Sequence, residues 1–572
     1  MLKHEKNEKG IYNPVMPNIE DWPIHKLSQE RELFIEQLTD ASTKHLTAMA
    51  GGAENLHQEI AKALYLERIR IKTEPWAVDP PDDKAFWHKV NQTLVETSLS
   101  TSQQDRSEEN AKVLQQIIAR YANEIVGRFE PSIYHRARKI LTSSFAQLFN
   151  TISTPRLFGG SKSGKSKPLG GRLSLVGNAE LIRDLSLKGT LLIVPTHFSN
   201  LDSVLIGWAI QAWGLPSVQY GAGLNLFNSK FFAYFMDRLG AYKVDRRKKN
   251  SLYIETLKMY SRMTLQKGCH SLFFPGGTRA RSGQIETRLK LGLLGTAVDA
   301  QRLNFVEAIS NHQPTSTAGK IFIVPLVLNY HFVLEANSLI EEHLRRRGKE
   351  SYYIIKSDFP STRKMTSFIS QFLWKKSEVF LSFGKPRDIF GYEVNKEGES
   401  LDKNGNVVDI SQYFTTDGKF VADEQRDSEY TKLLSEVIIK DFYQENMVLS
   451  SHLIAFVAFE MLLRRHNRLD LYGVLRLHEE DRRIPYDTFI ETVDKIRNVL
   501  KTMHDNDQVN LGTAIHSDIN RLIDHGLRNL GVYHSKKPLV RSKSGDYMSS
   551  EDMNLLYYYH NRLLGYELEK LI

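Results

Sequence analysis

The chain has 572 residues, of which 41% are hydrophobic and 25% are charged. This composition is ordinary for a folded protein and argues against long disordered tracts, and the length predicts about three or four domains. The single cysteine, Cys269, excludes an internal disulfide and a cysteine-based metal site. The longest apolar stretches, Val204 to Pro216 and Leu453 to Leu463, fall short of the roughly 20 residues that span a bilayer.

The formal net charge of +9 is modest for this length, but basic residues cluster at Arg246–Lys249 and at Arg345–Arg347. Such clusters face solvent, anionic lipid headgroups, nucleic acid or a phosphorylated substrate. We expect no nucleic-acid partner, because no segment matches a known nucleic-acid-binding module. The first residues also lack the apolar stretch of a secretory signal, so we expect a cytoplasmic protein with no signal peptide and no transmembrane helix.

Periodicity divides the chain into four parts. Residues 1–155 are expected to be helical, as in Glu109 to Arg128, where apolar residues recur at helical spacing. Residues 156–172, rich in glycine, serine and lysine, are expected to be a basic linker. Residues 173–427 alternate short apolar runs with amphipathic helices, which predicts an α/β domain, and residues 428–572 are expected to be helical.

Six short apolar runs within the α/β part are candidate strands. They are Thr190–Pro195, Ser217–Tyr220, Ala241–Val244, Ser271–Phe274, Ile321–Leu328 and Val379–Phe383. A helix is expected over Ser251–Lys267, and further helices over Leu453–Arg464, Tyr486–Thr502 and Met553–Leu571. Turn signals stand at Asn404-Gly405 and Asp417-Gly418.

The first candidate for chemistry follows the strand that ends at Pro195. His197 would lie at the carboxyl end of that strand, where α/β sheets usually bind ligands. Asp202 would lie in the first turn of the next helix, where its carboxylate can accept a proton from imidazole Nδ1 and leave Nε2 free to act as a base. The alternative is a purely structural capping box, Ser199-x-x-Asp202.

A second candidate follows the strand at residue 271. Its sequence is Phe-Phe-Pro-Gly-Gly-Thr-Arg-Ala-Arg-Ser-Gly, in which Gly277 and Thr278 free backbone N–H groups, and Arg279 and Arg281 can hold a phosphate through forked hydrogen bonds. A third strand delivers Arg246 to the same edge. A fourth contains Val324-Pro325, and a proline within a strand indicates a sheet edge or a bulge.

These four blocks, in this order, resemble the acyltransferase domain of the glycerol-3-phosphate acyltransferase family. The family's blocks read His-x4-Asp, Gly-x-x-x-Ile-x-Arg, Phe-Pro-Glu-Gly-Thr-Arg-x-Arg and a Val-Pro strand. The segments between them look closest to the bacterial glycerol-3-phosphate and dihydroxyacetone-phosphate acyltransferase branch, and the resemblance covers roughly residues 189–458. The segments that carry this closer likeness are Ala222–Leu226, Arg238–Ala241, Asn329–Glu335 and Asp423–Asp427.

The resemblance implies an α/β fold whose mixed sheet is flanked by helices, and an O-acyltransferase of phospholipid biosynthesis. Such an enzyme moves a fatty acyl group from acyl-CoA or acyl-carrier protein to glycerol 3-phosphate and gives lysophosphatidic acid. It would lie peripherally at the inner face of the membrane, with no cofactor and no metal. The implied catalytic residues are His197 and Asp202; the implied substrate-binding residues are Arg246, Gly277, Thr278, Arg279, Arg281 and Lys290.

One departure from the family keeps alternatives open. Gly276 stands where the family's third block carries glutamate, so a carboxylate is missing from the expected rim of the site. The acceptor could equally be 1-acylglycerol 3-phosphate or dihydroxyacetone phosphate, and a non-catalytic lipid-binding protein on the same scaffold is an alternative from another class. Residues Gly159–Ser166 match a P-loop pattern, but neither a strand before them nor a helix after them is expected.

Overall fold

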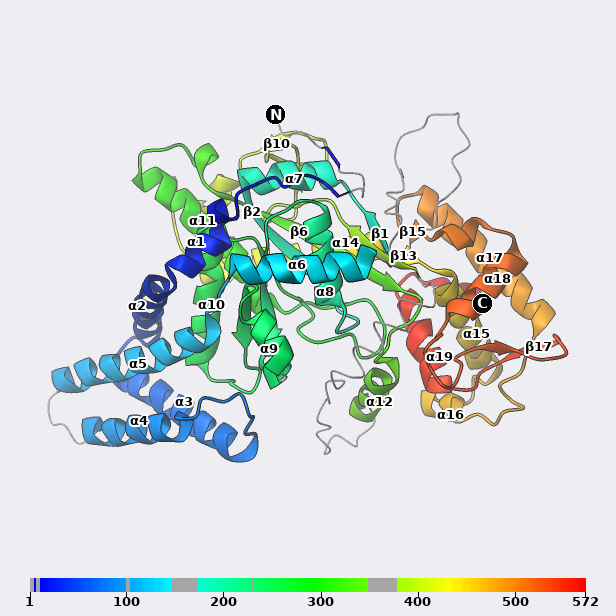
Figure 1. Cartoon of the computed structure of the whole chain (residues 1–572), viewed down its shortest axis with the longest axis horizontal. Coiled ribbons are helices and arrows are strands. Elements are labelled where there is room, and N and C mark those ends of the chain that lie inside the picture. The colour runs from blue at the N-terminus through cyan, green and yellow to red at the C-terminus, as the bar shows by residue number, and fades with distance from the viewer. Residues whose placement is uncertain (1–4, 7–10, 99–102, 147–172, 229, 348–377) are drawn as a thin grey trace.

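The structure is a computed structural model that describes residues 5–6, 11–98, 103–146, 173–228, 230–347 and 378–572. The expected linker at 156–172, with its P-loop-like pattern, lies outside these residues. Along the long axis of the molecule, the N-terminal helices lie at one end of a central sheet and the C-terminal helices at the other (Figure 1).

Seven strands form the central sheet in the order β1-β7-β6-β2-β5-β3-β4. Their bounds are β1 Leu173–Val176, β2 Gly189–Pro195, β3 Gln219–Gly223, β4 Ala241–Val244, β5 Ser271–Leu272, β6 Lys320–Tyr330 and β7 Val379–Phe383. Strands β2 to β6 pair in parallel, whereas β7 pairs antiparallel with β6 and parallel with β1. The expected α/β fold with a mixed sheet is therefore confirmed.

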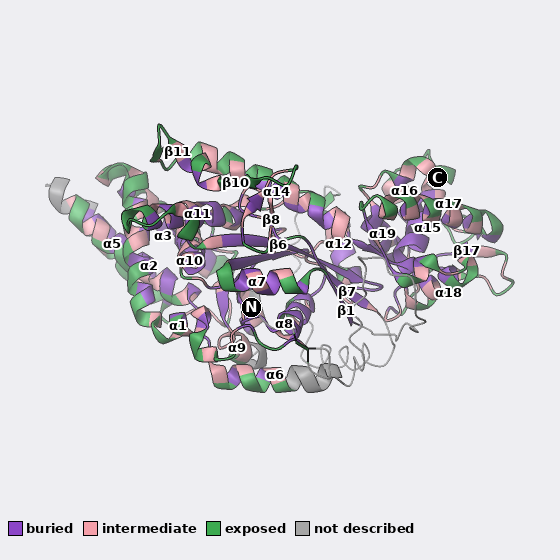
Figure 2. Ribbon diagram, turned by 90° about the horizontal axis from the view of Figure 1, so that it is seen from above, coloured by how far each residue is buried: buried purple, intermediate pink, exposed green. Residues whose placement is uncertain are grey.

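The middle of the sheet is fully buried, as Figure 2 shows for β6. Pro325 lies in β6, which pairs with β2 on one side and β7 on the other, so this proline is not at a sheet edge. The predicted bulge is present, because Leu326 pairs with Phe383 but Ile323 pairs with Arg387, which leaves one extra residue in the segment after β7. Its carbonyl accepts a hydrogen bond from Gly384 N–H on the β7 side. The regular pairing of β6 with β7 begins only at Leu326. The backbone N–H that a proline lacks is therefore not needed at residue 325 on the β7 side.

Helices cover both faces of the sheet, as the alternation of strands and amphipathic segments requires. They are α7 Ala179–Lys188, α8 Asp202–Ala212, α9 Lys230–Met236, α10 Ser251–Gln266, α11 Leu291–Ser310, α12 Ala336–Arg347 and α14 Glu424–Glu445. Helix α8 is apolar almost all round and mostly buried. Helix α14 begins at Glu424, so the boundary expected at residue 427 falls inside this helix, which packs on α11 and β6.

The N-terminal region is helical within the described residues. Its helices are α1 Pro23–Gln29, α2 Arg31–Ala50, α3 Ala53–Thr73, α4 Asp83–Ser98, α5 Gln103–Ile125 and α6 Pro131–Ala146. Helices α1 to α5 share a hydrophobic core with α10, which includes Cys269. Burial raises the pKa of the Cys269 thiol to about 12, which removes it from thiolate chemistry.

The C-terminal region contains α15 Ser450–Arg465, α16 Leu471–Leu475, α17 Tyr486–Asp505, α18 Ile519–Asn529 and α19 Met553–His560. Short strands accompany both this region and the segment before it: β8 Glu393–Val394, β9 Ser400–Leu401, β10 Val407–Val408, β11 Thr415–Thr416, β12 Lys419–Phe420, β13 Met447–Val448, β14 Ile484–Pro485, β15 Asn510–Leu511, β16 Val540–Arg541 and β17 Tyr547–Ser549. Gly405 and Gly418 turn two of the hairpins. Among the described helices, none combines the length and the apolarity needed to cross a membrane.

Candidate active site

Three of the predicted site segments meet at one edge of the sheet. His197 follows β2, Arg246 follows β4, and Arg279 follows β5. These strands run parallel, so their carboxyl ends lie on the same side, which is where open α/β sheets bind ligands. The loops also touch directly, because Ala280 N–H donates to the His197 carbonyl at 2.7 Å.

His197 and Asp202 form the predicted pair. The Nδ1 atom of His197 lies 2.8 Å from Oδ2 of Asp202, whose side chain is entirely buried, while 15% of the histidine side chain is exposed. A carboxylate in this position holds the proton on Nδ1, so Nε2 carries the free lone pair. The pair has the geometry of a general base with its orienting carboxylate.

Asp202 is held by more than the histidine. Its Oδ2 accepts hydrogen bonds from the backbone N–H groups of Phe198 and Ser199, at 2.7 and 3.0 Å. Its Oδ1 accepts the hydroxyl proton of Tyr330 at 2.5 Å. The alternative capping box is only half formed. Asp202 accepts from the Ser199 N–H, but the Ser199 hydroxyl does not cap α8, because it accepts from Leu201 N–H and donates to Glu335. Asp202 thus both steadies the loop and orients the imidazole.

Two neighbours fix the imidazole ring and its backbone. The ring stacks on Phe274, with centroids 3.9 Å apart and planes tilted by 21°. The backbone N–H of His197 donates to Oε1 of Glu286 at 3.1 Å. Ring and main chain are therefore both anchored, and the position of Nε2 is defined before any substrate arrives.

The three predicted arginines share one region of positive potential. Burial lowers the pKa of the Arg246 guanidinium, and the charges of Arg281 and Arg279 lower it further. Arg279 pairs with Glu335 at 3.4 Å, and Arg281 with Glu342 at 2.9 Å. Arg246 makes no hydrogen bond or ion pair with any other described residue, so its guanidinium remains available to an anion.

Gly276, Gly277 and Thr278 form a tight turn next to this arginine cluster. Gly277 has φ +75°, and its N–H closes the turn by donating to the Phe274 carbonyl at 2.9 Å. The N–H groups of Gly276 and Thr278 donate to no other group in the described parts of the chain. Of the three N–H groups of this turn, which the sequence offers as candidates for binding a developing oxyanion, these two are available and that of Gly277 is not.

Lys290 lies against the same turn. A Cβ atom built on Gly277 would come within 2.8 Å of Lys290 Nζ, and the Lys290 backbone N–H donates to the Pro275 carbonyl. The Lys290 ammonium has no carboxylate partner among the residues that the structure describes. The lysine therefore brings an uncompensated positive charge to the predicted substrate region.

Glu286 lies against residue 276, the position at which the family that the sequence resembles carries a glutamate. A Cβ atom on Gly276 would lie 3.0 Å from Cγ and 3.1 Å from Oε1 of Glu286. Burial raises the pKa of this carboxyl to about 7, although the His197 N–H bond opposes the shift. Its Oε2 is buried without a hydrogen-bond partner in the described structure. A carboxyl group therefore lies beside position 276, and it comes from ten residues further along the chain.

Sequence patterns did not identify three other residues of this region. Tyr330 is the last residue of β6, and Glu335 lies in the segment after it. Glu335 accepts from the Ser199 hydroxyl and from Asn200 N–H, both at 3.0 Å, and also pairs with Arg279. Arg562 reaches the site from the C-terminal region and lies 3.9 Å over the Phe198 ring. The Asn329–Glu335 likeness to the family was the available signal for the first two, and none existed for Arg562.

The basic run at Arg246–Lys249 divides by role. Arg247 pairs with Asp79 and Asp245 and lies 3.9 Å over Trp76, while Lys248 pairs with Glu124. These two cations join the N-terminal helices to the sheet. In this run, only Arg246 and Lys249 therefore remain candidates for binding an external anion, because Arg247 and Lys248 are engaged in these ion pairs.

Comparisons with known proteins agree with the geometry. Residues 175–329 match the family model described as Acyltransferase. A glycerol-3-phosphate acyltransferase of Actinobacillus pleuropneumoniae is 23% identical over 325 residues, which are 56% of this chain and 35% of that protein. One of Glaesserella parasuis is 21% identical over 537 residues, 93% of this chain and 56% of that protein. The chain thus spans less than two thirds of the length of either relative.

One solved structure also aligns, the 1-acyl-sn-glycerophosphate acyltransferase of Thermotoga maritima. The alignment covers 68% of this chain and 96% of that one, with 11% identity and a TM-score of 0.23. A TM-score of this size supports no statement about fold or substrate. The fold is described instead by the sheet and its strand order, and the likeness to acyltransferases by the match over residues 175–329.

Proposed function

We propose that this chain, which belongs to the acyltransferase family through residues 175–329, transfers a fatty acyl group from a thioester donor to glycerol 3-phosphate. The observation that carries the proposal is the His197–Asp202 pair beside a cluster of three arginines. A base and a phosphate-binding cluster are what acyl transfer to a phosphorylated alcohol requires. The product would be lysophosphatidic acid.

In the proposed reaction, His197 Nε2 takes the proton of the acceptor hydroxyl while its oxygen attacks the thioester carbonyl carbon. Asp202 stabilises the imidazolium that forms, and general-base help of this kind contributes about 10² to 10⁴ in rate. The N–H groups of Gly276 and Thr278 stabilise the tetrahedral oxyanion. When the C–S bond breaks, the proton passes from His197 to the leaving thiolate, so no covalent enzyme intermediate is needed.

The acceptor's phosphate would be held by Arg246, Arg279, Arg281 and Lys290. Arg279 and Arg281 are engaged by Glu335 and Glu342, so phosphate binding exchanges a carboxylate partner for the substrate. Arg246 needs no such exchange. We therefore assign the first contact with the phosphate to Arg246, with the other two arginines closing on it afterwards.

Glu286 supports a catalytic protein over a lipid-binding one. The loss of the family glutamate at Gly276 was the reason to consider a non-catalytic scaffold. The Glu286 carboxyl lies beside residue 276 and holds the His197 backbone, so a carboxyl group is present at this part of the rim. We assign Glu286 as a positioning residue, because its observed contact is with the His197 main chain.

The test is turnover with three acceptors side by side. Purified protein is incubated with acyl-CoA or acyl-carrier protein and with glycerol 3-phosphate, dihydroxyacetone phosphate or 1-acylglycerol 3-phosphate, and lipid products are separated. We expect lysophosphatidic acid from glycerol 3-phosphate at the highest kcat/KM, and no product with His197→Ala. A folded protein that gives no product with any acceptor and either donor would refute the proposal.

A lipid product also implies work at a membrane surface, and we propose a peripheral location at the cytoplasmic face. Arg345, Arg346 and Arg347 at the end of α12 are exposed, on the element that follows the site loop. Each exposed basic residue near an anionic surface contributes about 1 kcal/mol. We expect the protein to co-sediment with phosphatidylglycerol vesicles but not with phosphatidylcholine vesicles. Replacing Arg345, Arg346 and Arg347 by alanine should weaken this binding.

A further inference from the structure

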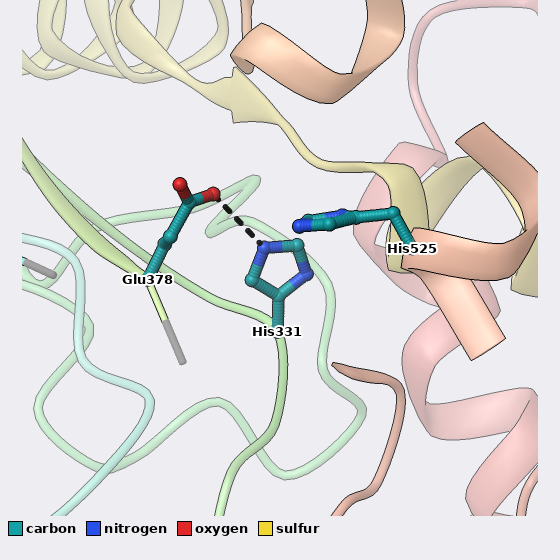
Figure 3. Close-up of side chains that lie close together, drawn as sticks. All are labelled: His331, Glu378 and His525. Carbon is teal, nitrogen blue, oxygen red and sulfur yellow. Dashed lines mark ion pairs between the residues drawn. The ribbon is translucent and has the colours of Figure 1, made fainter. Parts of the chain in front are cut away.

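A second cluster of chemically capable side chains lies apart from the acyltransferase site. His331 follows β6, Glu378 precedes β7, and His525 belongs to α18 (Figure 3). One ligand atom from each of the three lies within 4.8 Å of the other two. No other such group of histidine, cysteine and carboxylate residues occurs in the described part of the chain. The cluster thus brings three sequence-distant segments together around one point.

Both imidazoles are anchored through Nδ1. The Nδ1 atom of His331 lies 2.8 Å from the Ser451 hydroxyl, and that of His525 lies 2.8 Å from the Ser450 hydroxyl, at the start of α15. When a hydroxyl accepts from Nδ1–H, the lone pair is on Nε2. Histidines that bind metals are held in this way, with one nitrogen fixed by a hydrogen bond and the other left for the ion.

The Nε2 atom of His331 has no partner that satisfies it. The residue is 1% exposed, and this nitrogen is buried without a hydrogen bond to any described group. It lies 3.6 Å from Oε2 of Glu378, which is too long for a hydrogen bond. Ligand atoms around a tetrahedral zinc ion with bonds of about 2.0–2.1 Å stand roughly 3.3 Å apart, so a cation between the two fits this spacing with a small contraction.

The arrangement of the three side chains suits a cation. The two imidazole rings lie 5.3 Å apart between centroids, and the Glu378 carboxylate lies beside His331. Two neutral imidazoles and one carboxylate form a donor set that suits a borderline divalent cation.

We propose that His331, Glu378 and His525 form a binding site for a divalent transition-metal cation of the Zn²⁺ class. Two imidazole nitrogens and one carboxylate oxygen bind the ion, and a fourth position stays open to water. The ion would tie the sheet, at β6 and β7, to the C-terminal region at α18. Because Tyr330 precedes His331 and donates to Asp202, the same ion would also steady the segment behind the acyltransferase site.

The test measures metal binding directly and needs no acyl transfer. The full chain is stripped with chelator and titrated with Zn²⁺ by calorimetry, and cobalt substitution is followed by visible absorption. The variants are Glu378→Gln and His525→Ala, both at partly exposed positions that tolerate substitution better than buried His331. Each should weaken Zn²⁺ binding by more than about ten-fold, since even residues that only orient a ligand contribute that much.

A matched control is His516→Ala. This exposed histidine has another histidine ring, His504, 6.2 Å away but belongs to no three-ligand group among the described residues. The site is supported if the wild type and the control each bind one equivalent of Zn²⁺ and both site variants lose this binding. The melting temperature should rise with Zn²⁺ only in the proteins that bind it. No tight binding in the wild type, or equal binding in folded site variants, overturns it and leaves the cluster as an ion pair.

Discussion

Asp202→Asn tests the proposed base most directly, because the geometry allows the change without losing the fold. The carboxylate is fully buried, and Oδ2 takes three hydrogen bonds while Oδ1 takes one from Tyr330. An asparagine can keep its carbonyl oxygen in the Oδ2 position. Its NH₂ group then faces Tyr330, whose hydroxyl can rotate and accept the hydrogen bond instead of donating one.

What the substitution removes is the negative charge beside the imidazole. Without it, nothing in this contact stabilises the imidazolium that forms when His197 takes the acceptor's proton. General-base catalysis contributes about 10² to 10⁴ in rate, so kcat should fall by a factor in that range. That loss corresponds to a barrier higher by about 3 to 5 kcal/mol. The KM for the acceptor should change little, because Asp202 is buried and does not contact it.

The assay follows release of free CoA thiol at saturating glycerol 3-phosphate, with the melting temperature recorded for each variant. The matched control is Tyr330→Phe, which removes one hydrogen bond from Oδ1 but keeps the charge and the Nδ1 contact. It should cost about 1 to 3 kcal/mol of stability and less than ten-fold in kcat. Folded Asp202→Asn with wild-type kcat, or equal kcat losses in the two variants, would refute the reasoning.

Three further results are expected. Arg279→Ala should raise the KM for glycerol 3-phosphate and leave that for acyl-CoA unchanged; an effect on the donor alone contradicts the assignment. Gly277→Ala should lower the free energy of unfolding by roughly 1 to 3 kcal/mol and disturb the turn. Residue 277 has φ +75°, and an added Cβ would lie 2.6 Å from Lys290 Cδ. An unchanged melting temperature and activity would count against this prediction. Glu286→Gln should be more stable than wild type above pH 7 and equal to it below pH 4.5, measured by urea unfolding across pH.

The sign of the Glu286 effect follows from proton binding. Burial raises the pKa of this carboxyl from 4.5 to about 7 in the folded protein, so the folded state holds its proton more tightly than the unfolded chain. The wild type therefore loses stability as pH rises through this window. Glutamine has no proton to lose and escapes the penalty. A variant that is less stable than wild type at pH 8 would mean that the ionised carboxylate is favourable in the fold.

Strands could be predicted where an apolar run is bounded by polar residues. Elements were missed or misplaced where a glycine-rich segment or a turn adjoins the apolar run. Ala241–Val244 and Val379–Phe383 were predicted with the bounds that the structure has. Leu173–Val176 was missed, because four residues directly after a glycine-rich basic segment give little periodic signal. The α-helix expected over Met553–Leu571 ends at His560. The prediction was too long because apolar residues continue past His560, and periodicity does not detect the turn at Gly565, which has φ +96°.

The candidate site divides along the same line between local pattern and tertiary contact. His197 and Asp202 are five residues apart in one loop, so their spacing in the sequence already brings them into reach. Tyr330 bonds Asp202 across 128 positions, and Glu286 bonds His197 across 89. No spacing rule predicts such contacts, which depend on the order of strands in the sheet. The position of Glu286 beside Gly276 could not be predicted for the same reason.

The C-terminal region is part of the framework that holds the site. Arg562, almost completely buried, lies over the Phe198 ring and donates to the Leu328 carbonyl at 2.7 Å. Its neighbour Asn561 donates to the Ser282 carbonyl at 2.9 Å. One short segment thus braces the His197 loop, the end of β6 and the arginine loop together. Because burial lowers the pKa of Arg562 only to about 10, it remains a cation at neutral pH and needs buried acceptors. The side-chain oxygens of Asn446 and Asn329 also accept from it, besides the Leu328 carbonyl.

This bracing sets a requirement on residue 283. A Cβ atom at Gly283 would lie 2.2 Å from the Tyr558 carbonyl oxygen, so the arginine loop can lie against α19 only if this position is glycine. The residue also has φ +83°, which a side chain rarely adopts. Close approach and backbone angle therefore select the same residue independently. The arginines that would bind phosphate are thus positioned from the far end of the chain, and the segment from 173 to 427 does not by itself contain the complete site.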